Sequence, residues 1–445
     1  MRSSGVALAL LVLVVLPSAA GAAPGFGPAR TISGPGISAP AIAVGVRGDV
    51  AVAWHDARLK AIVVRRGRSA GRLGRAVVVA RGRVTSPRVA VSRAGVVAVA
   101  WDRDRTGAPG PARNTLRVTA ARRGRPFGRT MSLPFDPGPL DNEPPPGSIY
   151  ADTPAPVAVS ALLAGGDRFV VAGVVGGDLR AATTRGARWV TRHLADAAND
   201  ELSHATNAAG DVLLGYAGLT GPSTIRLARG ADGFAAPAQV TPTTIVQSHA
   251  PRVTLGGRRA SALSLAVAQG STTDFTVWGT PTGSWSETGA FHVPVVPGYS
   301  IISVSGWAFT VSPAGAVLEW TTSDYGNETC GPCRYAETPR LDAVVQRPDG
   351  TVVGPVELAS SSPVNAELID HLAADSTSGT AILAWVDRSS LRTTVVEADG
   401  PLAAPQTVGS ARVDTLSLTT NGPHALLAWI SHGRARIATY RDSPK

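Results

Sequence analysis

Residues 86–101 read S-P-R-V-A-V-S-R-A-G-V-V-A-V-A-W, and this stretch decides the fold. A short apolar segment ends in a tight turn at Gly95, and a continuous apolar run then closes on Trp101. Glycine supplies the positive φ of a tight hairpin, and an unbroken apolar run is typical of a strand buried on both faces. Two further strands are predicted at Leu116–Ala121 and Phe127–Leu133, so the unit contains four strands.

The same unit recurs along the chain. Its turn is found as Ser92-Arg93-Ala94-Gly95, Asn207-Ala208-Ala209-Gly210 and Ser312-Pro313-Ala314-Gly315. Its apolar second strand has seven further copies, several of them degenerate: Asp49–Trp54, Asp167–Val171, Asp211–Tyr216, Ala260–Val267, Ala316–Trp320, Thr380–Trp385 and His424–Trp429. Most copies are roughly 40 to 60 residues apart, close to the length of a propeller blade.

These repeats predict an all-β fold, a β-propeller of about eight four-stranded blades, with seven blades as the alternative if one repeat is miscounted. The last copy has only three strands and ends at Ile437–Tyr440, whereas residues 28–32 form a spare strand near the N-terminus. We expect the N-terminal strand to join the last blade and close the ring, because closure hides the edge strands.

The N-terminus has the pattern of a secretory signal peptide over residues 1–22. Arg2 precedes an apolar run, and small residues lead to a cleavage site near Ala22. No later stretch reaches the roughly 18 consecutive apolar residues of a spanning helix. We therefore expect a single propeller domain over residues 23–445, secreted or associated with the cell wall as a soluble monomer. The Arg-rich, Lys-poor composition indicates a bacterial source.

Two insertions interrupt the repeats. Residues 136–154 are rich in Pro and acidic residues, and residues 321–339 in the sixth copy hold both cysteines of the chain. Cys330-Gly331-Pro332-Cys333 has the spacing of a thioredoxin site, but no strand and helix pattern surrounds it. We favour a small disulfide that stiffens the loop; redox activity or a metal site are the alternatives.

Basic residues are concentrated in the first part of the chain. Residues 30–130 contain 21 Lys and Arg against 4 Asp, whereas residues 131–445 contain 20 basic against 28 acidic residues. The basic residues cluster at two turns between third and fourth strands, with Arg65 and Arg66 in the first and Arg122 and Arg123 in the second. Such a patch could bind an anionic cell-wall polymer. We favour the alternative, arginine on a solvated face. Only one aromatic residue, Phe127, interleaves the arginines, which disfavours nucleic acid.

Acidic residues follow the tryptophan of several second strands. We expect ligand contacts from loops of one face of the ring, around Asp56, Asp104, Asp324 and Tyr325. For the repeated acids we favour a structural role over a binding role, because Asp readily accepts hydrogen bonds from the backbone of a tight turn.

The run Val96–Trp101 followed by Asp102 resembles the repeats of secreted bacterial sialidase-like propellers. The resemblance extends over nearly the whole mature chain as a pattern of apolar runs and tryptophans. The family's Asp-box, S-x-D-x-G-x-x-W, is absent, and the nearest stretch, Ser92–Gly95, lacks the Asp. The family's catalytic residues therefore cannot be assigned to positions in this chain.

Two functional classes lead. The first is a non-catalytic extracellular binding protein for a glycan or another cell-envelope polymer. The second is a glycan-active hydrolase or lyase that uses carboxylates and a tyrosine across the central channel. Substituting Glu319 or Asp324 would abolish turnover only in the second class. A purely structural wall protein is a third reading, and the sequence indicates no cofactor and no metal.

Overall fold

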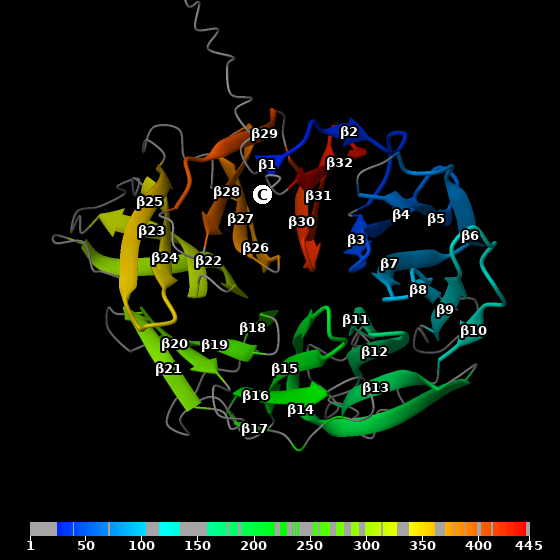
Figure 1. The fold of residues 1–445 in the computed structure, drawn as a ribbon, viewed down its shortest axis with the longest axis horizontal. Helices are drawn as coiled ribbons and strands as arrows, with labels where there is room; N and C mark the ends of the chain where they lie inside the picture. The colour runs from blue at the N-terminus through cyan, green and yellow to red at the C-terminus, as the bar shows by residue number, and fades with distance from the viewer. Residues whose placement is uncertain are drawn as a thin grey trace, which may run out of the picture.

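The strands of the chain group into blades arranged around a common centre (Figure 1). The computed structural model describes residues 25–441 apart from 39, 70–71, 104–114, 134–157, 176–177, 186–187, 219–222, 229–233, 235, 237, 240–251, 257–258, 268–272, 280–285, 293–298, 313–314, 327–337, 361–369, 378, 388, 398–401 and 411–412. Among these residues, no helix is long and apolar enough to cross a bilayer.

Within each blade the strands pair in chain order, and one long strand is shared by two blades. Blade 1 contains β3 (Ala41–Val44), β4 (Asp49–Asp56), β5 (Ala61–Arg68) and β6 (Val77–Arg81). Blade 2 contains β7 (Val84–Val91), β8 (Val97–Arg103), β9 (Thr115–Ala121) and β10 (Met131–Ser132). Blade 3 contains β11 (Ala158–Gly165), β12 (Arg168–Val175), β13 (Asp178–Arg185) and the first half of β14 (Arg188–Thr206). Blade 4 contains the second half of β14, then β15 (Val212–Gly218), β16 (Ser223–Ala228) and β17 (Ala238–Gln239).

The remaining four blades complete the ring. Blade 5 contains β18 (Arg252–Gly256), β19 (Arg259–Val267), β20 (Thr273–Gly279) and β21 (Ser286–His292). Blade 6 contains β22 (Tyr299–Ser312), β23 (Gly315–Gly326), β24 (Thr338–Gln346) and β25 (Val352–Ser360). Blade 7 contains β26 (Asp370–Ser376), β27 (Thr380–Asp387), β28 (Ser390–Glu397) and β29 (Gln406–Ser410). Blade 8 contains β30 (Thr415–Asn421), β31 (His424–Ser431), β32 (Arg434–Arg441), β1 (Gly25–Phe26) and β2 (Arg30–Thr31).

The described residues thus form eight blades, and each predicted copy of the apolar run falls on the second strand of a blade. The two ends of the chain meet in blade 8, as expected. Gly25 pairs with Arg441, and Arg30 pairs with Ile437. The inner strands contact one another around the whole ring, and β3 of blade 1 also contacts β30 of blade 8.

The blades are held together by their second strands. Successive residues of these strands face opposite neighbours, so the tryptophan meets the preceding blade and the alanine before it meets the following blade. The pairs that share a hydrophobic cluster are Trp101 with Ala53, Trp54 with Ala428 and Trp429 with Ala384. Truncating such a buried tryptophan to alanine typically costs about 3–5 kcal/mol.

The glycines of the recurring turn have the predicted conformation. Gly95, Gly210 and Gly315 have φ values of 74°, 91° and 121°. At Gly315 a Cβ atom would lie 2.0 Å from the carbonyl oxygen of Gln346, so this position requires glycine for space as well as for φ.

Part of the second predicted insertion forms strand. β23 continues through Gly326 and β24 begins at Thr338, so residues 321–326 and 338–339 extend the hairpin of blade 6. The strand continues past Trp320 because the next residue, Thr321, is also buried, with only 3% of its surface exposed. Residues 327–337 with Cys330 and Cys333, the first insertion at 136–154 and the signal sequence at 1–22 lie outside the described residues.

Candidate functional site

A large cavity lies in the central channel. It has a volume of about 600 Å³ and is lined by the inner strands of all eight blades. Most of its lining comes from the C-terminal ends of these strands, next to the turns that lead into the second strands. We call this end of the ring the turn face and the opposite end the loop face.

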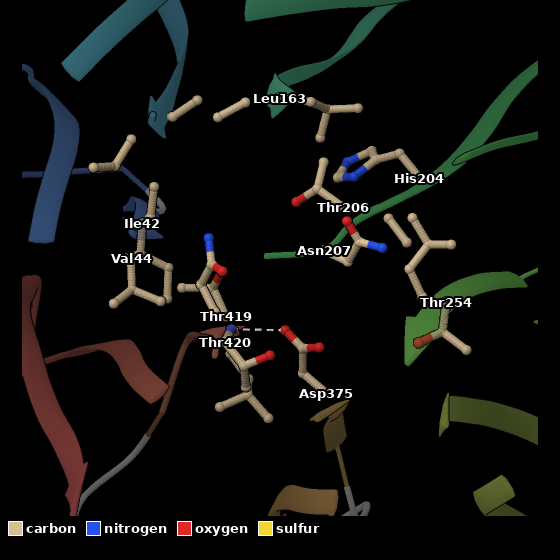
Figure 2. A pocket seen from close by; sticks show the side chains of 18 of the residues that line it. Ile42, Val44, Leu163, His204, Thr206, Asn207, Thr254, Asp375, Thr419 and Thr420 are labelled. Atoms are coloured by element: carbon tan, nitrogen blue, oxygen red, sulfur yellow. Dashed lines mark hydrogen bonds between the residues drawn. The ribbon is translucent and has the colours of Figure 1, made fainter. Parts of the chain in front are cut away.

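The lining of this cavity is mostly uncharged. Figure 2 shows hydroxyl and amide side chains from blades 4, 5 and 8 around the channel, together with apolar side chains from blades 1 and 3. The polar side chains include Thr206, Asn207, Thr254, Ser417, Thr419 and Asn421, and the apolar ones include Ile42, Val44, Leu163 and Phe309. Hydroxyl and amide groups both donate and accept hydrogen bonds, so the lining suits a ligand with many hydroxyl groups.

Asp375 is the one carboxylate among the residues that line the cavity. Its Oδ1 accepts a hydrogen bond from the Ser376 backbone N–H at 2.8 Å, and its Oδ2 accepts one from the Thr420 backbone N–H at 2.8 Å. Burial raises the pKa of Asp375 to about 6, although these hydrogen bonds favour the charged form. The carboxyl therefore joins blade 7 to blade 8 at the cavity wall (Figure 2) and changes charge near neutral pH.

Two other ionisable side chains line the cavity. His204 is exposed, and its ring points into the channel from β14 (Figure 2). Arg88 donates to the carboxylate of Asp102 at 3.2 Å, so its charge is compensated inside blade 2. Burial raises the pKa of Asp102, and Arg88 lowers it by its charge and its hydrogen bond. The cavity thus presents few free charges to a ligand.

The predicted acidic binding residues lie at the other end of the blades. Asp56 ends β4, and its Oδ1 accepts backbone N–H groups of Arg58 at 3.1 Å and Leu59 at 3.0 Å. This is the turn-capping arrangement that we favoured for the repeated acids. Asp324 and Tyr325 lie on β23 opposite Ile302 and Ile301, near the loop face. Asp104 lies outside the described residues.

The structure brings the two predicted arginine clusters together through one residue. Arg66 donates to the carbonyl oxygens of Arg125 at 3.0 Å and Arg122 at 3.4 Å in the neighbouring blade. Its guanidinium also lies 4.7 Å from the centroid of the Phe127 ring. Burial lowers the pKa of Arg66. Arg66 therefore links blades 1 and 2, whereas Arg122 and the neighbouring Arg123 are exposed.

Glu319 does not lie in the channel. It is 0% exposed on β23, and neither carboxyl oxygen has a hydrogen-bond partner among the described residues. It occupies the position before Trp320, where most other blades have alanine, and therefore faces blade 7. Burial raises its pKa well above the usual range, and the nearby backbone of Ala373 lowers it by less. Register therefore points the side chain of Glu319, which we named as a substitution to test for turnover, into a blade interface and not into the channel.

One group of side chains has the composition of a metal site. Asp178, His193 and Asp196 place one potential ligand atom each within 4.8 Å of the others, on β13 and β14 of blade 3. A β-bulge between Leu179 and Arg180 in the pairing of these strands turns His193 toward the same side. Arg180 already donates to Asp178 at 2.7 Å, which reduces the negative charge available to a cation.

The cavity residues had a weak sequence signal. Polar residues end the inner strands of blades 4, 7 and 8, as Thr206-Asn207, Asp375-Ser376-Thr377 and Thr419-Thr420-Asn421. Each segment precedes a tight turn, where polar residues are common for structural reasons. Only the ring arrangement shows that the three segments face one cavity.

Comparison with known proteins supports the fold. No family model matches the chain, and no curated protein matches it in sequence. The structure of Sqt1 from Saccharomyces cerevisiae is similar at 10% identity, covering 93% of this chain and 98% of that chain with a TM-score of 0.51. The polysaccharide lyase Uly1 is 9% identical over 91% and 90% of the two chains with a TM-score of 0.47. The intramolecular trans-sialidase from Ruminococcus gnavus is 9% identical over 65% and 90%, with a TM-score of 0.35. The chain is a β-propeller.

Proposed function

We propose that this protein is a secreted, non-catalytic binding protein that holds a carbohydrate chain at the turn-face end of its central channel. The observation that carries the proposal is the cavity of about 600 Å³ lined by hydroxyl and amide side chains from several blades. Its volume lies in the usual range of ligand sites. The hydroxyls of a sugar match groups that donate and accept, and the apolar wall around Ile42 and Leu163 suits its C–H faces.

Binding is favoured over hydrolysis by the number of carboxylates. Glycosidases usually flank the scissile bond with two carboxyl groups, one acting as acid and the other as base or nucleophile. Among the residues that line this cavity, Asp375 alone is acidic. The alternative, a hydrolase or lyase, would need a second group from elsewhere.

The test uses one blocking variant and one matched control. Thr206→Trp places a large side chain in the cavity, whereas Thr351→Trp adds the same side chain at an exposed turn of blade 6. Purified protein is incubated with neutral and acidic bacterial and plant polysaccharides, and the bound fraction and product masses are recorded. We expect retention on at least one polysaccharide, lost in Thr206→Trp and kept in Thr351→Trp, without new products.

Two results would contradict this function. Equal retention by both variants would place the site outside the channel. New product masses would show catalysis, and Asp375→Asn would then be the next variant to assay.

A further inference from the structure

A second cavity lies at the seam where the two ends of the chain meet. It has a volume of about 390 Å³ and lies between the outer segment of blade 8 and blade 1. Four arginines line it: Arg30 from β2, Arg65 and Arg68 from β5, and Arg72 from the segment that follows. No acidic side chain is among its lining residues.

Local structure explains why the arginines converge. Successive residues of β5 face opposite neighbours, so Arg66 reaches blade 2 whereas Arg65 faces the seam. The segment with Arg72 packs against β5, because the Gly74 N–H donates to the Arg66 carbonyl oxygen at 2.7 Å. The pairing of Arg30 with Ile437 in β32 brings its side chain to the same cavity.

The acidic residue that pairs with Arg68 is directed away from this cavity. Asp49 pairs with Arg68 in the sheet, but its carboxylate points toward blade 2, 3.9 Å from the Arg123 Nε. The Arg65 Nε is buried and has no hydrogen-bond partner among the described residues. A buried N–H without an acceptor is costly, and an anion in the cavity would supply one.

We propose that this cavity, which we call the arginine seam, binds a phosphate or sulfate ester carried by an acidic polymer. A tetrahedral oxyanion offers several acceptor oxygens, and guanidinium groups match it with forked, charge-assisted hydrogen bonds. The cavity volume exceeds what a single ion needs and leaves room for the group that carries it. The surrounding segment is strongly basic, with 21 Lys and Arg against 4 Asp in residues 30–130, which favours approach of a polyanion.

The arginine seam extends toward the turn face, the end of the ring that holds the channel cavity. Two of its lining residues, Val50 and Arg68, lie at the end of their strands near the turn at residues 45–48. The two sites use different residues, so this proposal stands whether or not the channel binds carbohydrate.

The test compares two double variants with the same loss of charge. Arg68→Gln with Arg72→Gln removes two exposed guanidinium groups from the seam, and Arg122→Gln with Arg125→Gln removes two exposed ones outside it. Binding of inorganic sulfate, inorganic phosphate, dextran sulfate and a phosphorylated mannan is measured by calorimetry at low ionic strength, with neutral dextran as the blank. We expect the seam variant to bind about tenfold or more weakly. The control should stay within about twofold, because its guanidinium groups touch no bound anion.

The arms of the experiment separate the sources of the anion. Preference for dextran sulfate indicates a sulfated polymer, and preference for the phosphorylated mannan indicates a phosphorylated one; either supports the proposal. Equal weakening in both double variants would overturn it in favour of diffuse attraction. Absence of sulfate and phosphate binding by the unaltered protein would also overturn it. Thr206→Trp should retain anion binding, which distinguishes failure of this site from failure of the channel site.

Discussion

Glu319 offers a direct test of how the interface between blades 6 and 7 is built. Its carboxyl is fully buried without a hydrogen-bond partner among the described residues, and burial raises its pKa well above the usual range. Glu319→Gln keeps the shape of the side chain and removes the ionisable proton. Any difference in pH dependence between the two proteins then reports on this one group.

The expected sign follows from the raised pKa. Below the unfolded pKa of about 4.3, the carboxyl is protonated in both states and has no effect on pH dependence. As the pH rises, the unfolded chain releases this proton while the folded protein keeps it. The unaltered protein therefore loses about 1.4 kcal/mol of unfolding free energy per pH unit, until the folded pKa is reached. Glu319→Gln lacks this loss, so its relative stability increases with pH.

Thermal unfolding midpoints measured between pH 4.5 and 7.5 check this prediction. For a chain of this length, about 1 kcal/mol corresponds to about 1 °C, so the difference should grow by about 1 to 1.5 °C per pH unit. Asp375 and Asp102 are present in both proteins and cancel in the difference. Glu357→Gln, at an exposed position of the same blade, should run parallel to the unaltered protein. Parallel curves for Glu319→Gln as well would refute a protonated carboxyl in this interface.

Three further changes test other parts of the ring by thermal unfolding. The unaltered protein should lose about 1–3 kcal/mol of unfolding free energy as pH rises from about 4 to 6, because the pKa of Asp375 is about 6, and Asp375→Asn should remove this loss. An unchanged pH profile would contradict the burial of this carboxyl. Gly315→Ala should destabilise the protein more than Gly350→Ala. Both glycines have a positive φ, which costs an alanine about 1–2 kcal/mol, but only at Gly315 would the added Cβ atom meet a backbone oxygen. Arg66→Lys should lower the unfolding free energy by about 1–3 kcal/mol, because lysine cannot make the forked hydrogen bonds of Arg66 to two carbonyl oxygens. Unchanged stability would rule out a role of Arg66 in joining blades 1 and 2.

The blades could be predicted from local pattern because each is built from neighbours in the chain. The apolar run at Val96–Trp101 and its copies mark second strands, since only a strand covered on both faces is apolar throughout. The turn glycines set the hairpins, and the spare segment at residues 28–32 matched the missing strand of the last blade. These signals depend on contacts between residues that are close in sequence or repeat with a regular spacing.

The acidic residues show where such reasoning was weakest. Asp56 follows a tryptophan in a repeated position and caps a turn, as we favoured, but the sequence left a binding role open beside this one. Glu319 was a candidate for substitution in a glycan-active enzyme, but register directs it into a blade interface. A one-residue shift along a strand moves a side chain to the opposite face, and residue type alone does not report that direction.

The cavities depend on the ring as a whole. Burial at the channel raises the pKa of Asp375, and the hydrogen bond from Thr420, which belongs to the next blade, opposes that shift. The arginine seam needs Arg30 beside Arg65, and that proximity exists only because the first and last segments of the chain share a blade. Hydrophobic periodicity within a blade could be read from the amino acids in order. The faces between blades and around the channel form only when eight blades close on one another, because closure brings together residues hundreds of positions apart.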